Sequence, residues 1–220
     1  MSHAGSMTVA SVDYARKSKF IQVKPAVDRL VAGTALFFLL PLIAVIGWLV
    51  KRDGGPVFYG HTRIGKDGRE FKCLKFRSMA VNGDEILADL LAHDPEAEAE
   101  WAATRKLRND PRVTPVGRFL RKSSLDELPQ LFNVLRGEMS VVGPRPVTRD
   151  ELRHYGMRAR DYMSCTPGIT GLWQVSGRSD TTYRRRVALD TLYARQRSLL
   201  MDVQILFRTI PAVLNGSGAR

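Results

Sequence analysis

Two adjacent carboxylates, Asp126 and Glu127, directly follow a group of cationic side chains in this sequence. The cations are Arg118, Arg121 and Lys122. Guanidinium and ammonium groups bind phosphate oxygens, and an ionised Asp can attack phosphorus to give an aspartyl phosphate, which divides one difficult displacement into two easier steps. Glu127 could then help to hold Mg²⁺, which prefers carboxylate and phosphate oxygens. The segment therefore indicates phosphate chemistry.

The same residues also have the pattern of a helix start. Ser124 and Glu127 have the spacing of a capping box, in which Glu127 need only accept a hydrogen bond from the Ser124 backbone N–H. A helix that begins here would offer N–H donors and partial positive charge to a phosphate and would keep Asp126 ionised. Taken alone, the pattern fits helix capping better than catalysis.

Two further segments present an arginine on a turn. Arg145 stands between two prolines in the segment 143–146, and Arg178 ends a glycine-containing loop that begins at Pro167. Such turns can fix a guanidinium for bidentate recognition of a phosphate or a base. The sequence has no GxxxxGK[ST] phosphate loop, GxSxG elbow, GxGxxG motif or Asp-x-Asp pair.

Charge and metal-binding residue types narrow the choice of partner. The chain has 34 Lys and Arg against 22 Asp and Glu, a formal net charge of +12, which implies a polyanionic partner: nucleic acid, anionic lipid or a phosphorylated substrate. Cys73 and Cys165 are far apart, and the four histidines are scattered, so neither a disulfide framework nor a zinc site is indicated.

An uncharged apolar segment, Leu30–Val50, is long enough to cross a membrane as a helix. Lys and Arg are dense on both of its sides, which by the positive-inside rule places both ends in the cytoplasm. Pro41 removes a backbone donor near its middle and bends a helix. We therefore predict a re-entrant membrane helix hairpin over residues 24–52 with its break at Pro41. An ordinary single-pass helix is the alternative.

The remaining patterns predict an α+β, mainly helical fold. Residues 57–61 and 70–77 read as strands of a small basic β-hairpin, joined through a turn at 66–68. The last apolar stretch, 199–214, is interrupted by polar residues, so it is a poor membrane span and a fair interfacial helix, with its apolar side in lipid or on the core. Further helices are expected over 85–108, with a break near Pro95, over 115–121, from Ser124 onward, and over 183–197.

The predicted organisation is a flexible N-terminus over residues 1–23, the membrane helix over 24–52, and a catalytic domain over 53–220. In this arrangement the catalytic domain lies on the membrane surface, with amphipathic interfacial helices around the active site, and forms one functional unit with the membrane helix.

From about Lys24 to Leu214 the sequence resembles the monotopic phosphoglycosyl transferases of the bacterial sugar transferase family. The resemblance implies that Asp126 takes a sugar phosphate from a UDP-sugar and releases UMP, that Glu127 assists with Mg²⁺, and that a polyprenyl phosphate such as undecaprenyl phosphate then accepts the sugar phosphate. The segments that carry it are Leu40–Pro41, YGHTRIG at 59–65, CLKFRSM at 73–79, RKSSLDELPQLFN at 121–133, RGEMSVVGPRP at 136–146 and PGITGLWQVSGR at 167–178.

The resemblance also suggests roles for single residues. By position, Arg121 would contact phosphate and Arg145 would lie in the nucleotide pocket, while Lys75 and Arg77 are weaker candidates for lining the site. Together with the motifs above, the candidate substrate-binding residues are Arg121, Arg145, Lys75, Arg77, Arg118 and Arg178.

The same resemblance implies the cellular setting. It places the protein on the cytoplasmic face of the bacterial inner membrane, with membrane lipid as a partner, no nucleic acid and a possible homodimer. Closer similarity to members that start exopolysaccharide assembly makes galactose or glucose the expected sugar, with galactose slightly ahead.

Two alternatives predict different observations. A non-enzymatic basic protein of the membrane surface would bind anionic lipid or nucleic acid in a salt-sensitive manner through many Lys and Arg residues. An enzyme that transfers the intact sugar without its phosphate would release UDP in place of UMP.

Overall fold

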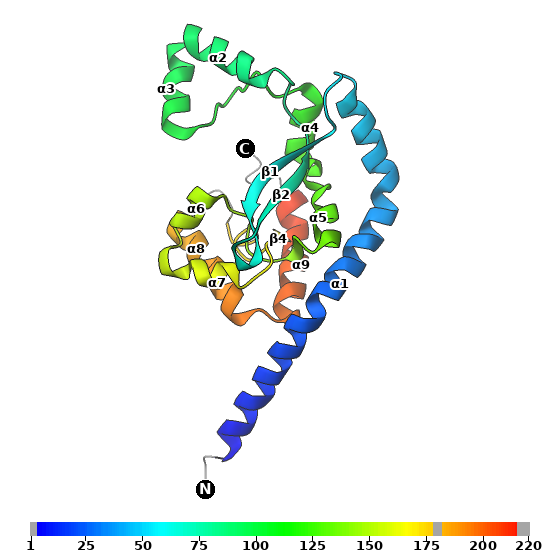
Figure 1. The fold of residues 1–220 in the computed structure, drawn as a ribbon, viewed down its shortest axis with the longest axis vertical. Coiled ribbons are helices and arrows are strands. Elements are labelled where there is room, and N and C mark those ends of the chain that lie inside the picture. The colour runs from blue at the N-terminus through cyan, green and yellow to red at the C-terminus, as the bar shows by residue number, and fades with distance from the viewer. Residues whose placement is uncertain (1–3, 178–181, 215–220) are drawn as a thin grey trace. The chain divides into compact units, whose positions relative to one another are not determined.

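The computed structural model describes residues 4–177 and 182–214 of the chain. Its elements, labelled in Figure 1, are mainly helices with a few short strands, which confirms the predicted mainly helical class. The described residues form two compact units. The first comprises residues 4–40, 60–74, 129–177 and 182–214, and the second comprises residues 41–59 and 75–128.

Helix α1 (Ala4–Lys51) is the longest element and contains the apolar segment. Among the described residues, its stretch Lys19–Lys51 is the one helix long and apolar enough to cross a membrane. Pro41 lies inside this uninterrupted helix, so the two separate arms of the predicted hairpin are one helix in the structure. Residues 4–23, predicted to be flexible, are also helical, because the long apolar helix continues toward the N-terminus.

In the first unit, two short parallel strands form the centre, with Ser140 paired to Gly168 and Val142 to Thr170. Gly168 is required where they meet, because a Cβ there would lie 2.1 Å from the Gly143 backbone nitrogen. Buried Val142 and Ile205 belong to one apolar cluster around this sheet. The strands are β3 (Ser140–Val142) and β4 (Gly168–Thr170), and the helix before β3 is α5 (Gln130–Arg136).

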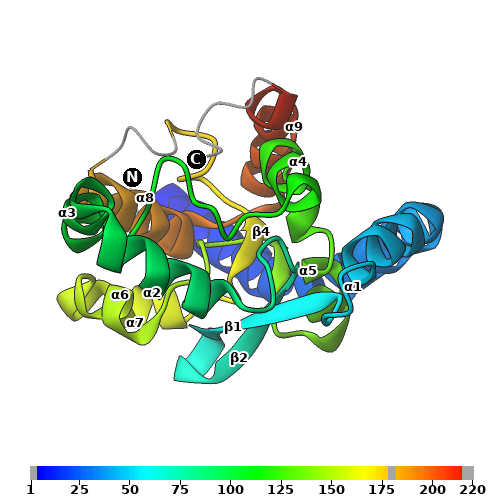
Figure 2. The same cartoon turned by 90° about the horizontal axis from the view of Figure 1, so that it is seen from above.

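Further helices follow in the same unit, and Figure 2 shows α6, α7 and α8 close together. The helices are α6 (Arg149–Arg153), the 3₁₀ turn η3 (Gly156–Arg158), α7 (Ala159–Met163), α8 (Tyr183–Gln196) and α9 (Leu199–Leu214). The last two confirm the helices predicted over 183–197 and 199–214. Buried Tyr155, Tyr162 and Val187 pack in a second apolar cluster among these helices.

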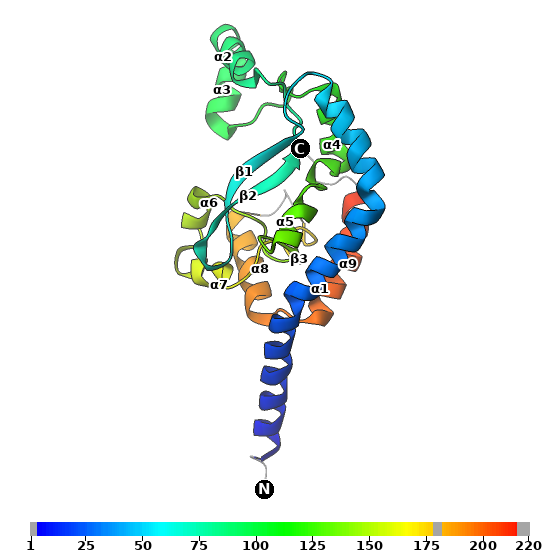
Figure 3. The same cartoon turned by 45° about the vertical axis from the view of Figure 1, so that its right-hand side comes forward.

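A buried ion pair joins α1 to α9 within the first unit, where Figure 3 shows the two helices side by side. Lys24 Nζ lies 2.6 Å from Asp202 Oδ2, and the Tyr193 hydroxyl donates to Asp202 Oδ1 over 2.7 Å. Asp28 of α1 accepts from the Ser140 hydroxyl at the start of β3. Such buried polar contacts favour one alignment of α1 with α9 and β3, because any other alignment would leave a buried polar group unpaired, which lowers the free energy of unfolding.

Strands β1 (Phe58–Ile64) and β2 (Glu70–Phe76) form the predicted small hairpin and contribute residues to both units. The 3₁₀ turn η1 (Lys66–Gly68) connects them, with Asp67 at φ 57° and Gly68 at φ 77°, a backbone region that Asp and Gly tolerate. Buried Asn133 holds β2: its amide accepts from Leu74 N and donates to Lys72 O.

The second unit contains the predicted helix pair with its break at Pro95, seen in Figure 2 as two consecutive helices. Asp94 caps the second helix by accepting from the Glu96 and Ala97 backbone N–H groups, and Pro95 occupies its first turn. Thr114 caps the following helix in the same way through Gly117 N. The helices are α2 (Gly83–His93), α3 (Pro95–Thr104) and α4 (Pro115–Ser123).

Candidate active site

The acidic pair lies just after α4, in a turn instead of at a helix start. Ser124 ends α4 in the left-handed conformation, with φ 57°, and its side chain forms no capping hydrogen bond. Asp126 and Glu127 occupy the 3₁₀ turn η2 (Leu125–Glu127), and the next α-helix begins only at Gln130. The helix start predicted at Ser124 is thus a short 3₁₀ turn, in which the Glu127 backbone N–H donates to Ser124 O over 3.3 Å, and the Ser124 side chain does not cap it.

Both carboxylates contact Lys75, near the end of β2 and in the same unit as the turn. Its Nζ lies 3.2 Å from Asp126 Oδ2 and 2.7 Å from Glu127 Oε1, so one ammonium bridges both carboxylates. The Asp126 side chain is 10% exposed, against 34% for Glu127 and 37% for Lys75. Asp126 is thus held inside the protein, while the side chain of Glu127 reaches solvent.

The electrostatic setting differs from the one predicted for a helix N-terminus. Burial raises the pKa of Asp126 above its ordinary value, and the Lys75 ammonium offsets this only in part. Burial acts to lower the pKa of Lys75, but the charges of Glu127 and Asp126 outweigh it and the pKa is raised. A carboxylate with a raised pKa is more basic and thus a better nucleophile, while the adjacent cation favours its ionised form.

Two of the predicted arginines are on α4. Arg121 lies in the last turn of this helix, and its Nε donates to the Ser78 hydroxyl over 2.9 Å. The positive charge of Arg121 acts to lower the pKa of Asp126. Arg118 is exposed one turn earlier. Close packing fixes the helix, because a Cβ on Gly117 would lie 2.0 Å from the Ser78 carbonyl oxygen. The structure therefore brings Asp126, Glu127, Lys75 and Arg121 together.

Arg77 has a different environment from the one predicted. It is buried, and its Nε donates to Pro56 O while its Nη1 and Nη2 reach Met79 O and Val50 O. Both oxygens of Asp53 accept the remaining two donors. All five donors of the guanidinium are thus taken by the protein, which is the behaviour of a residue that holds the end of α1 to the end of β2.

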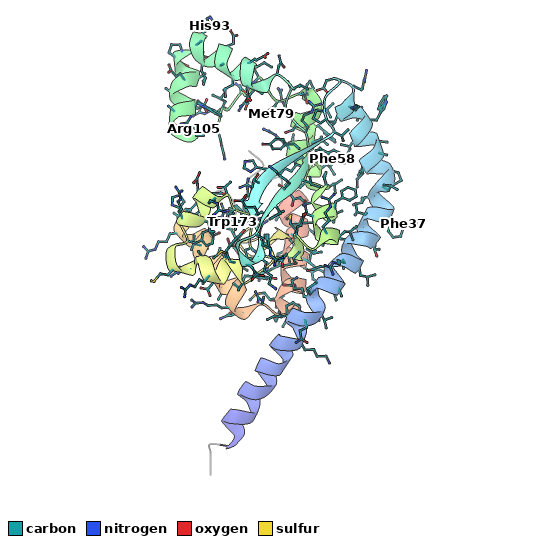
Figure 4. All side chains as sticks on the ribbon, in the orientation of Figure 1. Phe37, Phe58, Met79, His93, Arg105 and Trp173 are labelled. Carbon is teal, nitrogen blue, oxygen red and sulfur yellow. The ribbon has the colours of Figure 1, made fainter. Side chains whose placement is uncertain are left out.

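Arg145 belongs to the first unit, where its guanidinium lies 5.4 Å from the centre of the Trp173 ring. A second arginine that was not predicted from the sequence lies there: Arg186 of α8 is 4.8 Å from the same ring and 3.5 Å from Glu151. Three consecutive arginines, Arg184–Arg186, are visible in the sequence. Only Arg186 is buried, and this depends on tertiary packing that the sequence does not reveal. Figure 4 labels Trp173 among the surrounding side chains.

Arg178, the last predicted arginine, lies outside the described residues. Within the described part of the chain, no three His, Cys, Asp or Glu side chains are grouped so that they could hold a metal ion. Two carboxylates, those of Asp126 and Glu127, do converge on a single cation.

Known proteins with similar sequences fall in one family. The family model for bacterial sugar transferases matches residues 19–216. The exopolysaccharide production protein ExoY of Rhizobium meliloti is 57% identical over 197 residues, which cover 89% of this chain and 87% of that protein.

Longer relatives match through part of their length. The undecaprenyl-phosphate galactose phosphotransferase of Salmonella typhimurium is 51% identical over 93% of this chain and 42% of its own. The UDP-glucose:undecaprenyl-phosphate glucose-1-phosphate transferase of Xanthomonas campestris is 42% identical over 90% of this chain and 40% of its own. These matches extend over nearly the whole described sequence, and the chain belongs to the bacterial sugar transferase family.

Proposed function

We propose that this protein transfers a hexose 1-phosphate from a UDP-sugar to undecaprenyl phosphate, releases UMP and so starts the assembly of an exopolysaccharide. The observation that carries the proposal is the buried Asp126, paired with Lys75 beside Glu127 and Arg121, in a chain with relatives named for this transfer and one named for exopolysaccharide production. Galactose is the preferred sugar and glucose the second, since relatives named for each match the chain.

The residues supply a two-step route. An Asp126 carboxylate oxygen attacks the phosphorus that bears the sugar, the bond from this phosphorus to the UMP oxygen breaks, and UMP leaves with that oxygen. An oxygen of the lipid phosphate then attacks the same phosphorus, and the bond to Asp126 breaks, which restores the carboxylate. Arg121 and Lys75 stabilise the negative charge on the phosphoryl oxygens during both steps.

The acidic pair suits a magnesium ion. Asp126 and Glu127 already direct one oxygen each toward a single cation, and carboxylates completed by substrate phosphate oxygens form the ligand set that Mg²⁺ prefers. When bound, the ion would neutralise charge on the diphosphate. Asp126 and Glu127 would hold it.

The membrane setting is also a proposal. We infer that α1 enters the cytoplasmic leaflet of the inner membrane, bends at Pro41 and keeps both basic flanks in the cytoplasm, while α9 lies along the lipid surface. A cysteine introduced at Ser6 should then react with a membrane-impermeant maleimide in lysed cells and not in intact spheroplasts. Labelling in intact spheroplasts would identify a single-pass helix with its N-terminus outside.

The proposed transfer is tested by intact mass of the detergent-purified protein. With UDP-galactose or UDP-glucose and Mg²⁺ but no lipid acceptor, we expect an adduct of one hexose phosphate together with released UMP. Asp126→Asn should abolish both, whereas Asp84→Asn, an exposed carboxylate of the same unit, should change neither. Full UMP-releasing turnover by Asp126→Asn with acceptor present would refute Asp126 as the nucleophile, and release of UDP would indicate transfer of the intact sugar.

A further inference from the structure

The ammonium of Lys75 stands at the point on which the two carboxylates of the acidic pair converge. It lies 3.2 Å from Asp126 Oδ2 and 2.7 Å from Glu127 Oε1. These are the oxygens to which the proposed function assigns Mg²⁺. Two cations cannot share one such position without strong repulsion at this separation, so Lys75 and the metal ion compete for it.

We propose that Lys75 is an internal counter-ion that keeps divalent metal off the acidic pair until the nucleotide substrate is bound. When the diphosphate enters, the Lys75 ammonium moves onto a phosphate oxygen and the metal ion takes its place between Asp126 and Glu127. Metal and nucleotide therefore bind cooperatively, and the nucleotide-free enzyme binds metal weakly. This inference rests on the proposed function.

The environment of Lys75 permits such a move. Its side chain is 37% exposed, and a four-carbon stem with a single ammonium can reorient at small cost. Asp126, in contrast, is buried and fixed in the turn after α4, so the carboxylate stays while the lysine leaves. Arg77, two residues further along, has protein acceptors for all five donors and cannot play this part.

The charges set the direction of the effect. With Lys75 in place, its ammonium contacts an oxygen of each carboxylate, and a metal ion at that position must first displace it. Removal of the ammonium takes away this contact and its positive charge, so the attraction of the two carboxylates for a divalent ion increases. We expect the affinity for metal alone to rise at least about tenfold, because opposite charges interact strongly at this separation in a partly buried site.

The test measures Mn²⁺ binding to the full-length protein in detergent by electron paramagnetic resonance, with and without UDP, which carries the diphosphate but no sugar. The wild type should bind Mn²⁺ weakly alone and much more tightly with UDP. Lys75→Met should bind Mn²⁺ at least about tenfold more tightly than wild type without UDP and gain little from UDP. Lys75→Arg keeps the cation and should resemble the wild type; Lys75→Gln replaces Lys75→Met if the latter fails to fold.

A matched control separates this local effect from net charge. Lys106→Met removes the same charge from an exposed lysine that follows α3 in the same unit and should leave Mn²⁺ affinity within about threefold of wild type, since exposed charges are screened. Adding Glu127→Gln to Lys75→Met should cancel the gain, which locates the ion at the acidic pair.

Three results would overturn the proposal: equal effects of Lys75→Met and Lys106→Met, equal strengthening of Mn²⁺ binding by UDP in wild type and Lys75→Met, or a gain that survives the loss of Glu127. UMP release from a UDP-sugar by the wild type is measured separately. A failure of metal displacement is thereby distinguished from a failure of the proposed sugar-phosphate transfer.

Discussion

Arg77 and Lys75 show how two cations on one strand end acquire different tasks. Both residues lie in the segment 73–79 that resembles the family. In the structure, Lys75 contacts the acidic pair, while Arg77 is enclosed by backbone carbonyls and Asp53. The difference comes from burial and from the number of acceptors around each group. A partly exposed ammonium can serve a substrate, whereas a guanidinium with every donor taken serves the fold.

Arg77→Lys should therefore lower stability and not substrate affinity. Lysine keeps the charge but cannot reach all the acceptors of the guanidinium, and the loss of a buried, paired network costs roughly 2–4 kcal/mol. Thermal unfolding in detergent should show a clear decrease in Tm, and the exposed Arg69→Lys should show none. An unchanged Tm together with a raised KM for the UDP-sugar would instead make Arg77 a substrate contact.

Asp190 gives a pH prediction at the same scale. Burial raises the pKa of this carboxyl to about 6, although the Tyr155 hydroxyl donates to it over 2.6 Å. The native state therefore holds the proton to higher pH than the unfolded chain, so stability decreases as pH rises from about 4 to about 6.

Asp190→Asn should remove that dependence. The Tm of the variant relative to wild type should improve between pH 4 and pH 7, by an amount equivalent to roughly 2 kcal/mol. Asp150→Asn, at an exposed carboxylate of α6, should show no such trend. A Tm difference between Asp190→Asn and wild type that is constant with pH would contradict the raised pKa.

At the scale of elements, local signals were sufficient where a few neighbouring residues decide the structure. Pro95 predicts the break between α2 and α3, and the structure confirms it, with Asp94 as the cap of α3. Strands β3 and β4 were not predicted, because each is only three residues long and they pair across a long separation in sequence. Ser124 and Glu127 match a capping box locally, but the ion pair of Glu127 with Lys75, which is remote in sequence, could not be predicted from this pattern.

The sequence of helix α9 left open whether its apolar side lies in lipid or on the protein core. In the structure, the helix has three distinct sides. Asp202 and Ile205 are buried on one side, whereas the exposed Gln204 and Arg208 share another. A third side is apolar and exposed, which is the pattern of a helix that lies on a lipid surface. It consists of Leu199, Leu200, Val203, Leu206, Phe207 and Ile210.

Spin labels on α9 should distinguish these sides. Ile210 and Arg208 are both exposed, and positions two residues apart point to nearly opposite sides of a helix. In liposomes, a label at Ile210→Cys should be accessible to oxygen and protected from a water-soluble nickel chelate, with the reverse at Arg208→Cys. The native Cys73 and Cys165 are buried and should not react. Equal accessibility at the two positions would contradict contact of this stripe with lipid.

At the scale of the whole molecule, an excess of basic charge coexists with a long apolar helix. The net charge is +12, and Phe37, labelled in Figure 4, projects from α1 with 75% of its surface exposed. These two features favour different modes of membrane association. Basic charge alone gives a peripheral protein held by anionic lipid, whereas an inserted apolar helix is held by hydrocarbon contacts.

Extraction from membranes separates the two modes. At about 1 M salt the Debye length falls to about 3 Å, so attraction between exposed basic residues and anionic lipid is largely screened, while burial of apolar surface is not weakened. We therefore expect the protein to remain in the pellet after a wash with 1 M NaCl and to enter the supernatant only with detergent. Release by salt would instead show that many weak ionic contacts are the whole of the attachment. Retention would leave α1 as the anchor, since it is the one described helix long and apolar enough to resist such a wash.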